Sequence, residues 1–164
     1  MTTWSGQPSP INSFLGPTVN LSPYTVVSSG STIARTLADR FAQVQHVKDF
    51  GAVCDGIADD TAAVQAAINA SSIGDTVLFD GTCVCSSALT MTVPITLDGG
   101  NCSKSILKFT GSNGLVITHD GNTRTQYHIR NLSITTTANG LYTGVSFTQT
   151  PSSQFRRLTI DTVV

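Results

Sequence analysis

The sequence predicts a mainly β protein whose short strands run from about residue 75 to the end of the chain. In that part, apolar and β-branched stretches alternate with Gly, Asn, Asp and Ser, which favour turns. All ten acidic residues are aspartates, and the absence of glutamate, a good helix former, fits a β-rich chain. An Ala-rich segment just before the strands has the spacing of a single short helix.

The N-terminal region carries no charged side chain before Arg35 and contains four of the six prolines. Disordered tails are usually highly charged and poor in aromatic residues. This region is uncharged and contains apolar anchors, so residues 1–30 are interpreted as an extended arm that becomes ordered against a partner. A flexible terminus without a partner is the alternative. The anchors selected for docking are Trp4, Phe14, Leu15 and Tyr24.

Residues 32–44 have the spacing of a short amphipathic helix. Ile33, Leu37, Phe41 and Val44 recur at intervals of four, four and three residues. Because this helix has no helical neighbour in sequence, its apolar stripe must pack on the rest of the protein or against copies of itself. We expect it to form a self-associating neck, although the repeat is too short to establish a coiled coil.

Residues 49–70 are predicted to form turns followed by a capped helix over residues 60–70. Glycine can adopt positive φ, and Asp-Gly is a strong turn pair. An aspartate before the helix can accept the free N–H groups of its first turn. The aspartate spacing does not fit an EF-hand loop, so no metal site is predicted. The residues assigned to turns and caps are Gly51, Asp55, Gly56, Asp59 and Asp60.

Short strands separated by turn residues are predicted after residue 75. Such a chain can form an antiparallel sandwich, whose turns come every eight to twelve residues, or a solenoid with several strands per coil. The predicted strands are Val77–Phe79, Cys83–Cys85, Ile95–Leu97, Ile106–Phe109, Leu115–Thr118, Ile129–Ile134, Val145–Thr148 and Phe155–Ile160.

A partial internal repeat is compatible with the solenoid. The apolar positions Ile129, Leu132 and Ile134 recur 26 residues later, and a glycine precedes each of the strands that begin at Leu115 and Val145. A spacing of this size suggests one coil of a solenoid. Periodicity alone leaves the sandwich and the solenoid both open.

The stretch Asp49–Ile68 reads DFGAVCDGIADDTAAVQAAI. It matches the pattern D-F-G-A-x-x-D-G-x-x-D-D-T-x-A-x-Q-x-A-I and resembles the opening of the pectate-lyase-like right-handed β-helix domain of phage tailspikes and polysaccharide-degrading enzymes. The resemblance implies a right-handed parallel β-helix and so decides between the two folds. It implies much less about chemistry, because β-helix proteins with different substrates share it.

The expected protein therefore has three regions: an extended arm (1–30), a neck helix with linker (31–48), and the first coils of a β-helix (49–164). An Ala-rich helix is thin enough to cover the unpaired apolar end of the first coil. No capping element follows the last predicted strand, so we expect the β-helix to continue beyond the chain. The resemblance also implies a homotrimer, because trimers are usual among tailspikes.

Four cysteines raise the question of a zinc site. Cys83 and Cys85 are one residue apart, which is not the usual spacing of a structural zinc knuckle. In a strand this spacing places both thiols on the same face. The N-terminus lacks the features of a secretory signal, so we expect a reducing compartment and buried free thiols, with no metal and no cofactor.

Composition argues against two classes of partner. The formal net charge is −1, only 12% of residues are charged, and Arg156-Arg157 is the one adjacent basic pair. Nothing in this pattern favours nucleic acid. No apolar stretch is long enough for a transmembrane helix, so membrane insertion is not expected.

Catalytic residues are not defined by the sequence. Glycoside hydrolysis uses two carboxylates about 5–5.5 Å apart for retention or about 6.5–9.5 Å for inversion. β-Elimination from a uronic acid needs a base beside a cationic group, and no spacing places His46, His119 or His128 beside one. The weak carboxylate candidates, each at a strand end that also suits a turn, are Asp80, Asp98, Asp120 and Asp161.

The leading interpretation is the N-terminal region of a phage tailspike. The arm would bind a tail or baseplate adaptor protein, the neck would trimerise, and later coils would bind and depolymerise bacterial surface polysaccharide. Such a protein would be assembled in the host cytoplasm and located in the virion. A polysaccharide lyase or hydrolase not tied to a virion, and a non-enzymatic adhesion β-helix, are the alternatives.

Overall fold

The computed structural model describes residues 24–111, 114–119, 126–137, 143–149 and 157–161. The chain divides into two compact units, residues 1–40 and 41–164, and each is considered by itself. Trp4, Phe14 and Leu15 of the predicted arm lie outside the described residues.

The first unit contains a small antiparallel hairpin followed by a short helix. Strand β1 (Thr25–Val27) pairs with β2 (Ala34–Thr36), and α1 spans Leu37–Phe41. The hydroxyl of Thr36 accepts a hydrogen bond from the backbone N–H of Asp39 at 3.0 Å, which caps the start of α1. The prediction of one helix over 32–44 is therefore wrong, because β-branched residues of β1 provide a strand partner for its first part.

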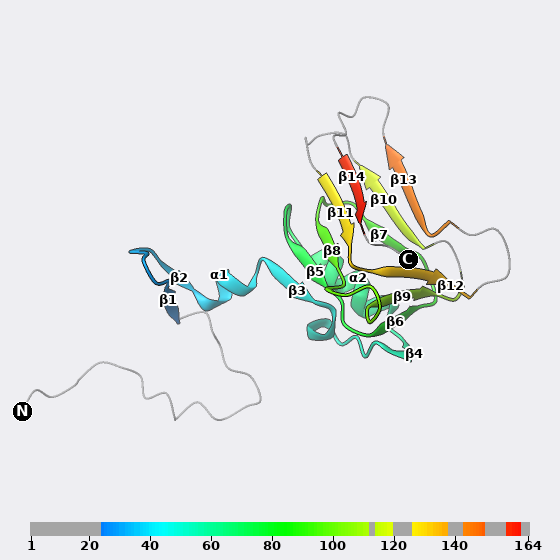
Figure 1. Cartoon of the computed structure of the whole chain (residues 1–164), viewed down its shortest axis with the longest axis horizontal. Helices are drawn as coiled ribbons and strands as arrows, with labels where there is room; N and C mark the ends of the chain where they lie inside the picture. Colours follow the sequence, from blue (N-terminus) through cyan, green and yellow to red (C-terminus); the bar gives the residue numbers. More distant parts are fainter. Residues whose placement is uncertain (1–23, 112–113, 120–125, 138–142, 150–156, 162–164) are drawn as a thin grey trace, which may run out of the picture. The chain divides into compact units, whose positions relative to one another are not determined.

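The second unit is a parallel β-helix built from three sheets (Figure 1). A five-stranded sheet contains β3, β5, β8, β11 and β14, which span Val44–His46, Thr76–Leu78, Thr96–Asp98, Gln126–Arg130 and Arg157–Asp161. A four-stranded sheet contains β4, β6, β9 and β12, which span Asp55–Asp59, Thr82–Cys85, Ile106–Phe109 and Ser133–Thr136. A three-stranded sheet contains β7, β10 and β13, which span Leu89–Met91, Leu115–His119 and Val145–Gln149.

From β5 onward the chain passes through the three sheets in the same order, and every pairing between coils is parallel. The parallel register stacks inward-facing apolar residues of successive coils on one another. Val77, Leu97 and Ile129 form one such column, and all three are fully buried. Each added coil buries a further apolar residue in every column. The free energy of unfolding is therefore roughly a sum of contributions from the interfaces between neighbouring coils.

In the first coil, helix α2 (Thr61–Ala70) stands where later coils have a strand of the three-stranded sheet. Its stripe of Val64, Ala67 and Ile68 is buried, as predicted. The carboxamide of Gln65 completes the free edge of β7, because it donates to the carbonyl of Thr90 and accepts from the N–H of Thr90, each at 2.8 Å. The predicted capping helix is thus confirmed, and Gln65 supplies the two hydrogen bonds that a neighbouring strand would make.

Two details of the predicted pattern are wrong. Strand β3 pairs with β5, so the β-helix begins at Val44 and not at Asp49. Ile129 lies beside Ile160, so the last coil is 31 residues long and not 26. The Gly-led strands do pair as expected, with Leu115 beside Val145.

The predicted strand Ile129–Ile134 is divided between two sheets. Asn131, at φ 52°, adopts the left-handed conformation that turns the chain from β11 into β12. Asn tolerates this conformation better than most residues that carry a side chain. The turn at Asn131 could not be recognised in the sequence, because Leu132, which follows it, is fully buried and continues the apolar pattern.

Candidate functional site

The turn residues of the opening motif adopt the predicted backbone. Gly51 (φ 95°) ends a 3-10 helix, η1 (Val47–Phe50), and Gly56 has φ 83°. One carboxylate oxygen of Asp55 accepts the N–H groups of Ile57 and Ala58, at 2.8 and 2.9 Å. These bonds lower the pKa of Asp55 and define a turn, so the predicted turn role is confirmed.

Asp60 has a different role from the helix cap that its position predicts. It stands at the N-cap of α2, but its side chain makes no capping hydrogen bond. Its carboxylate instead accepts the N–H groups of Val53 (2.7 Å), Cys54 (3.1 Å) and Val84 (3.3 Å). The side chain is almost fully buried and joins the first coil to the second.

Asp59 links the same two coils at the surface. Its carboxylate accepts hydrogen bonds from the backbone N–H of Thr61 and from the hydroxyls of Thr61 and Ser86. The hydroxyl bonds from Ser86 and Thr61 hold the pKa of Asp59 well below the ordinary value of 3.8. Asp59 is therefore the residue that accepts from the first turn of α2, which is the function expected of Asp59 or Asp60.

This lowered pKa predicts an acid-dependent loss of stability. Asp59 stays ionised in the folded chain below pH 3.8, whereas the unfolded chain takes up a proton there. The stabilisation is therefore complete above pH 3.8 and declines as the pH falls below it. Asp59→Asn and Ser86→Ala should both flatten the dependence of the urea midpoint on pH between 5 and 2. A wild-type slope in both variants would contradict the assignment.

The cysteines differ from the prediction of free thiols. Cys54 and Cys83 form a disulfide between the first and second coils, while Cys85 and Cys102 are free. Spacing in sequence could not show this pairing, because the solenoid brings the two residues together across 29 positions. Cys83 and Cys85 are both buried on the inner side of β6, as expected, and burial raises the pKa of the Cys85 thiol to about 12.

The structure describes the side chains of two of the four catalytic candidates, Asp80 and Asp98, and each is engaged in an ion pair. Asp80 is exposed and forms an ion pair with Lys48, at 3.2 Å. Asp98 forms an ion pair with Arg130 at 2.9 Å and accepts from the amide of Asn131 at 3.1 Å. Asp120 lies outside the described residues. The structure describes only the backbone of Asp161, which lies in β14 and is the register partner of Arg130 in β11.

The contacts of Asp98 determine whether its carboxyl group can act as a general acid. Partial burial favours its neutral form, but hydrogen bonds from Gly100 and Asn131 and the charge of Arg130 outweigh burial and lower the pKa of Asp98. A carboxyl group that stays ionised is a poor general acid. Asp98 therefore does not fit the acid of a glycosidase pair.

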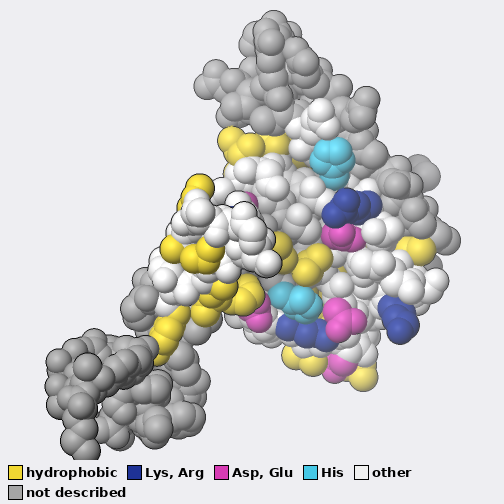
Figure 2. All heavy atoms as spheres, turned by 60° about the vertical axis from the view of Figure 1, so that its left-hand side comes forward, with side chains coloured by type: hydrophobic (Ala, Val, Ile, Leu, Met, Phe, Trp, Pro, Cys, Tyr) yellow, Lys and Arg dark blue, Asp and Glu magenta, His cyan; other side chains and the backbone are white. Residues whose placement is uncertain are grey.

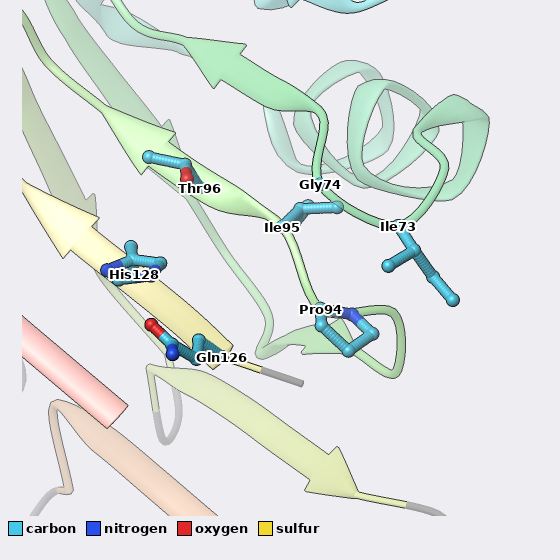
Figure 3. A pocket seen from close by; sticks show the side chains of 7 residues that line it. All are labelled: Ile73, Gly74, Pro94, Ile95, Thr96, Gln126 and His128. Atoms are coloured by element: carbon cyan, nitrogen blue, oxygen red, sulfur yellow. The ribbon is translucent and has the colours of Figure 1, made fainter. Parts of the chain in front are cut away.

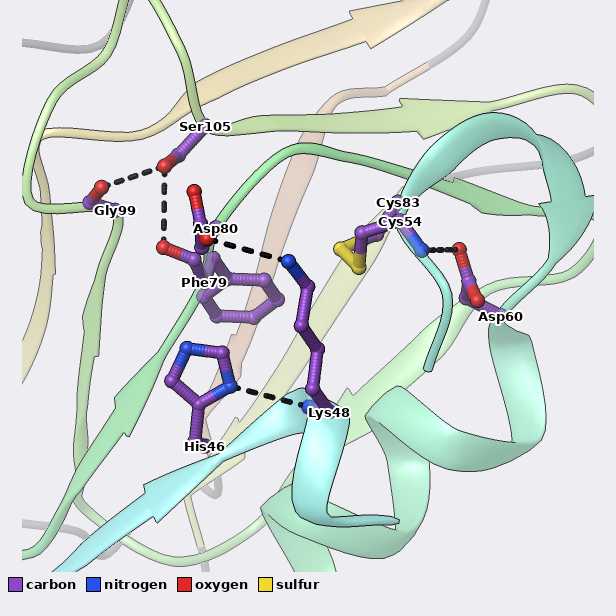
Figure 4. A network of polar contacts seen from close by, with 9 residues as sticks. All are labelled: His46, Lys48, Cys54, Asp60, Phe79, Asp80, Cys83, Gly99 and Ser105. Carbon is purple, nitrogen blue, oxygen red and sulfur yellow. Dashed lines mark hydrogen bonds and ion pairs between the residues drawn. A yellow bond between two sulfur atoms is a disulfide. The ribbon is translucent and has the colours of Figure 1, made fainter. Parts of the chain in front are cut away.

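The structure pairs a cation with a carboxylate next to His46, a contact that sequence reasoning missed. His46 Nδ1 accepts the backbone N–H of Lys48, and Lys48 Nζ contacts Asp80 (Figure 4). Lys48 and Asp80 belong to successive coils and are 32 residues apart, so no local spacing could reveal them. Figure 2 shows two groups of histidine, acidic and basic side chains on one face of the β-helix.

A cavity of about 280 Å³ lies at the N-terminal ends of β8 and β11 (Figure 3). Thr96, Gln126 and His128 form its polar side. The turn containing Ile73 and the segment containing Pro94 form its apolar side. Thr96 and His128 are register partners, so the cavity opens along the outer face of the five-stranded sheet.

Fold and site together define a parallel β-helix whose first coil is closed by a helix and whose outer sheet face is polar and charged. The family model described as "Rhamnogalacturonase A/epimerase, pectate lyase-like" matches residues 44–162, which is more than half of the chain. The chain belongs to this family. None of the curated proteins matches it.

Solved structures similar to this chain include a phage protein and an epimerase module. ORF18 of Geobacillus virus E2 is 29% identical, over 59% of this chain and 22% of the phage protein, with a TM-score of 0.52. The A-module of the mannuronan C-5 epimerase AlgE4 from Azotobacter vinelandii is 24% identical, over 72% of this chain and 37% of the module, with a TM-score of 0.51. At that identity the epimerase shows the fold alone. This chain spans less than half of either protein.

Proposed function

We propose that this chain is the N-terminal region of a phage tailspike. Residues 1–30 attach the spike to an adaptor protein of the tail or baseplate, and the first unit assembles with copies of itself. The β-helix that follows carries the polysaccharide-binding function, extended by later coils. The observation that carries the proposal is a compact unit preceding a capped β-helix, in a chain similar to a phage protein.

The exposed apolar side chains of the first unit and of the start of the second support self-association. Ile33 is 71% exposed, Phe41 61% and Tyr24 47%. A two-stranded hairpin is marginally stable by itself, and three copies packed together would bury these side chains. Figure 2 shows hydrophobic side chains gathered at the surface of this part of the chain. Because α1 ends at Phe41 and Val44 lies in β3, the proposed trimer contact consists of the hairpin and α1.

The outer face of the five-stranded sheet supports a role with polysaccharide. A sugar ring has hydroxyl groups and an apolar face, and the cavity has Gln126 and His128 on one side and Pro94 and Ile73 on the other. The family description also concerns proteins that act on sugar polymers. The same observations favour the second candidate, a polysaccharide-acting enzyme that is not tied to a virion.

The deciding experiment measures mass in solution by light scattering for the wild type and for Ile33→Ser/Phe41→Ser. The tailspike proposal predicts a trimer for the wild type and a monomer for the variant, whose β-helix keeps its circular dichroism. Ser28→Ala provides a matched change on the hairpin that removes a polar contact with Arg40 and leaves the apolar face intact. A monomeric wild type would exclude the trimer.

Attachment and polysaccharide binding are tested separately. Deleting residues 1–23, the part of the arm that precedes Tyr24 and the hairpin, should abolish incorporation of the full-length spike into virions while leaving the trimer intact. Binding of capsular polysaccharide to this chain, followed by fluorescence or calorimetry, should be weakened by His128→Ala. Binding without incorporation into virions favours the enzyme that is not tied to a virion.

A further inference from the structure

Two sulfur atoms and a carboxylate form a buried group between the first two coils. The side chains are those of Cys54, Asp60 and Cys83, and their ligand atoms all lie within 4.8 Å of one another. All three residues are buried, and the sulfur atoms are joined as a disulfide (Figure 4). Nothing in the proposed attachment or sugar-binding roles uses this group.

The carboxylate of Asp60 has capacity for one more partner. An ionised carboxylate offers about four acceptor positions. Three backbone N–H groups, those of Val53, Cys54 and Val84, occupy three of them. Asp60 takes part in none of the ion pairs found among the described residues, so its buried charge faces no cationic side chain. Buried charges in proteins are paired or coordinate metals, so a metal cation is a chemically suitable fourth partner.

We propose that reduction of the Cys54–Cys83 disulfide creates a Zn²⁺ site made of both cysteine sulfurs and the Asp60 carboxylate. A cellular dithiol supplies two electrons and two protons, becomes a disulfide itself, and leaves two thiols on the protein. Binding of Zn²⁺ then releases two protons as both thiols become thiolates. Water takes the fourth tetrahedral position.

Coordination requires the two sulfur atoms to move apart once reduction breaks the bond between them. Sulfur atoms bound at about 2.3 Å to a tetrahedral Zn²⁺ lie about 3.8 Å apart, and the Asp60 carboxylate already lies within 4.8 Å of both sulfurs. The N–H bonds to Asp60 orient the carboxylate as an outer shell of donors would. Val53, next to Cys54, is 54% exposed, so the segment that carries Cys54 reaches the surface at the preceding residue. Disulfide and metal exclude each other, and the redox state selects between them.

Cobalt titration of the 164-residue chain tests the site. The protein is reduced without oxygen, freed of reductant and titrated with Co²⁺, whose bonds to thiolate give a charge-transfer absorption in the near ultraviolet. We expect one Co²⁺ per chain, displaced by Zn²⁺, and no such absorption for the oxidised protein. A reduced and folded wild type without this absorption would overturn the proposal.

Variants identify the ligands. Cys54→Ala and Cys83→Ala should each remove the absorption. Asp60→Asn removes a direct ligand, so it should weaken Co²⁺ binding by more than the about 10- to 100-fold that loss of an outer-shell partner typically costs. Cys85→Ala is the matched control, because Cys85 is a buried thiol on the same strand but lies outside the group. Circular dichroism reports whether each variant is folded. An absorption that survives both Cys54→Ala and Cys83→Ala would also overturn the proposal, because the metal would then lie elsewhere.

Discussion

Replacing Asp60 with alanine is expected to lower the free energy of unfolding by on the order of 3–5 kcal/mol. The change leaves the N–H groups of Val53, Cys54 and Val84 without their acceptor, and each orphaned buried donor costs about 1–3 kcal/mol. Water can reach Val53 more easily than the other two, so the three costs do not add fully. Urea unfolding followed by circular dichroism measures the effect.

Asp59→Ala is the matched control for this prediction. Asp59 is the neighbouring aspartate and also joins the first two coils, but it is exposed, so water replaces it as an acceptor. Its loss should cost much less than the loss of Asp60. Equal losses for the two variants would contradict the role assigned to the buried carboxylate.

Gly99→Ala is expected to destabilise the β-helix by about 3 kcal/mol or more, or to prevent folding. A Cβ atom at Gly99 would lie 2.0 Å from the carbonyl oxygen of Asn131 and 2.8 Å from the Cβ of Ser105. The obstacle is the backbone of the next coil, which cannot move without breaking the hydrogen bond from the Gly99 N–H to the carbonyl of Arg130. Thermal and urea unfolding measure the loss.

Gly100→Ala tests whether the close approach of two coils is the cause. Gly100 has a positive φ of 64°, but a Cβ atom there would meet nothing within 4 Å. The expected cost is the conformational strain alone, about 1–2 kcal/mol. If both alanine variants lost the same stability, the steric argument for Gly99 would be wrong.

The motif at residues 49–68 illustrates what local pattern can predict. The turns at Asp55 and Gly56 and the buried stripe of α2 depend on contacts between residues close in sequence, and they were found where expected. The role of Asp60 was not, because the N–H groups that donate to its carboxylate include that of Val84 in the next coil. The position of Asp60 before α2 predicted a helix cap, but its carboxylate accepts N–H groups of other segments instead.

The candidate site was predicted less well than the fold, for the same reason. The strand-end position correctly marked Asp80 as a surface residue, whereas Asp98 is partly buried. The ion-pair partners of both, Lys48 and Arg130, lie 32 residues away. The cavity beside His128 combines turns and strands from three coils. Coil length varies along the chain, so a fixed repeat could not give the register that brings these groups together.

The sequence by itself determined the class of fold, the closing helix and the turns that precede this helix. Each depends on local propensity and on a compact pattern of glycines, aspartates and alanines. Only the tertiary structure decided which side chains meet. The Cys54–Cys83 disulfide, the Gln65 edge contact and the Lys48–Asp80 pair all join successive coils. In a solenoid the neighbours across a coil interface are set by register, and register follows from the packing of inward columns rather than from any short stretch of sequence.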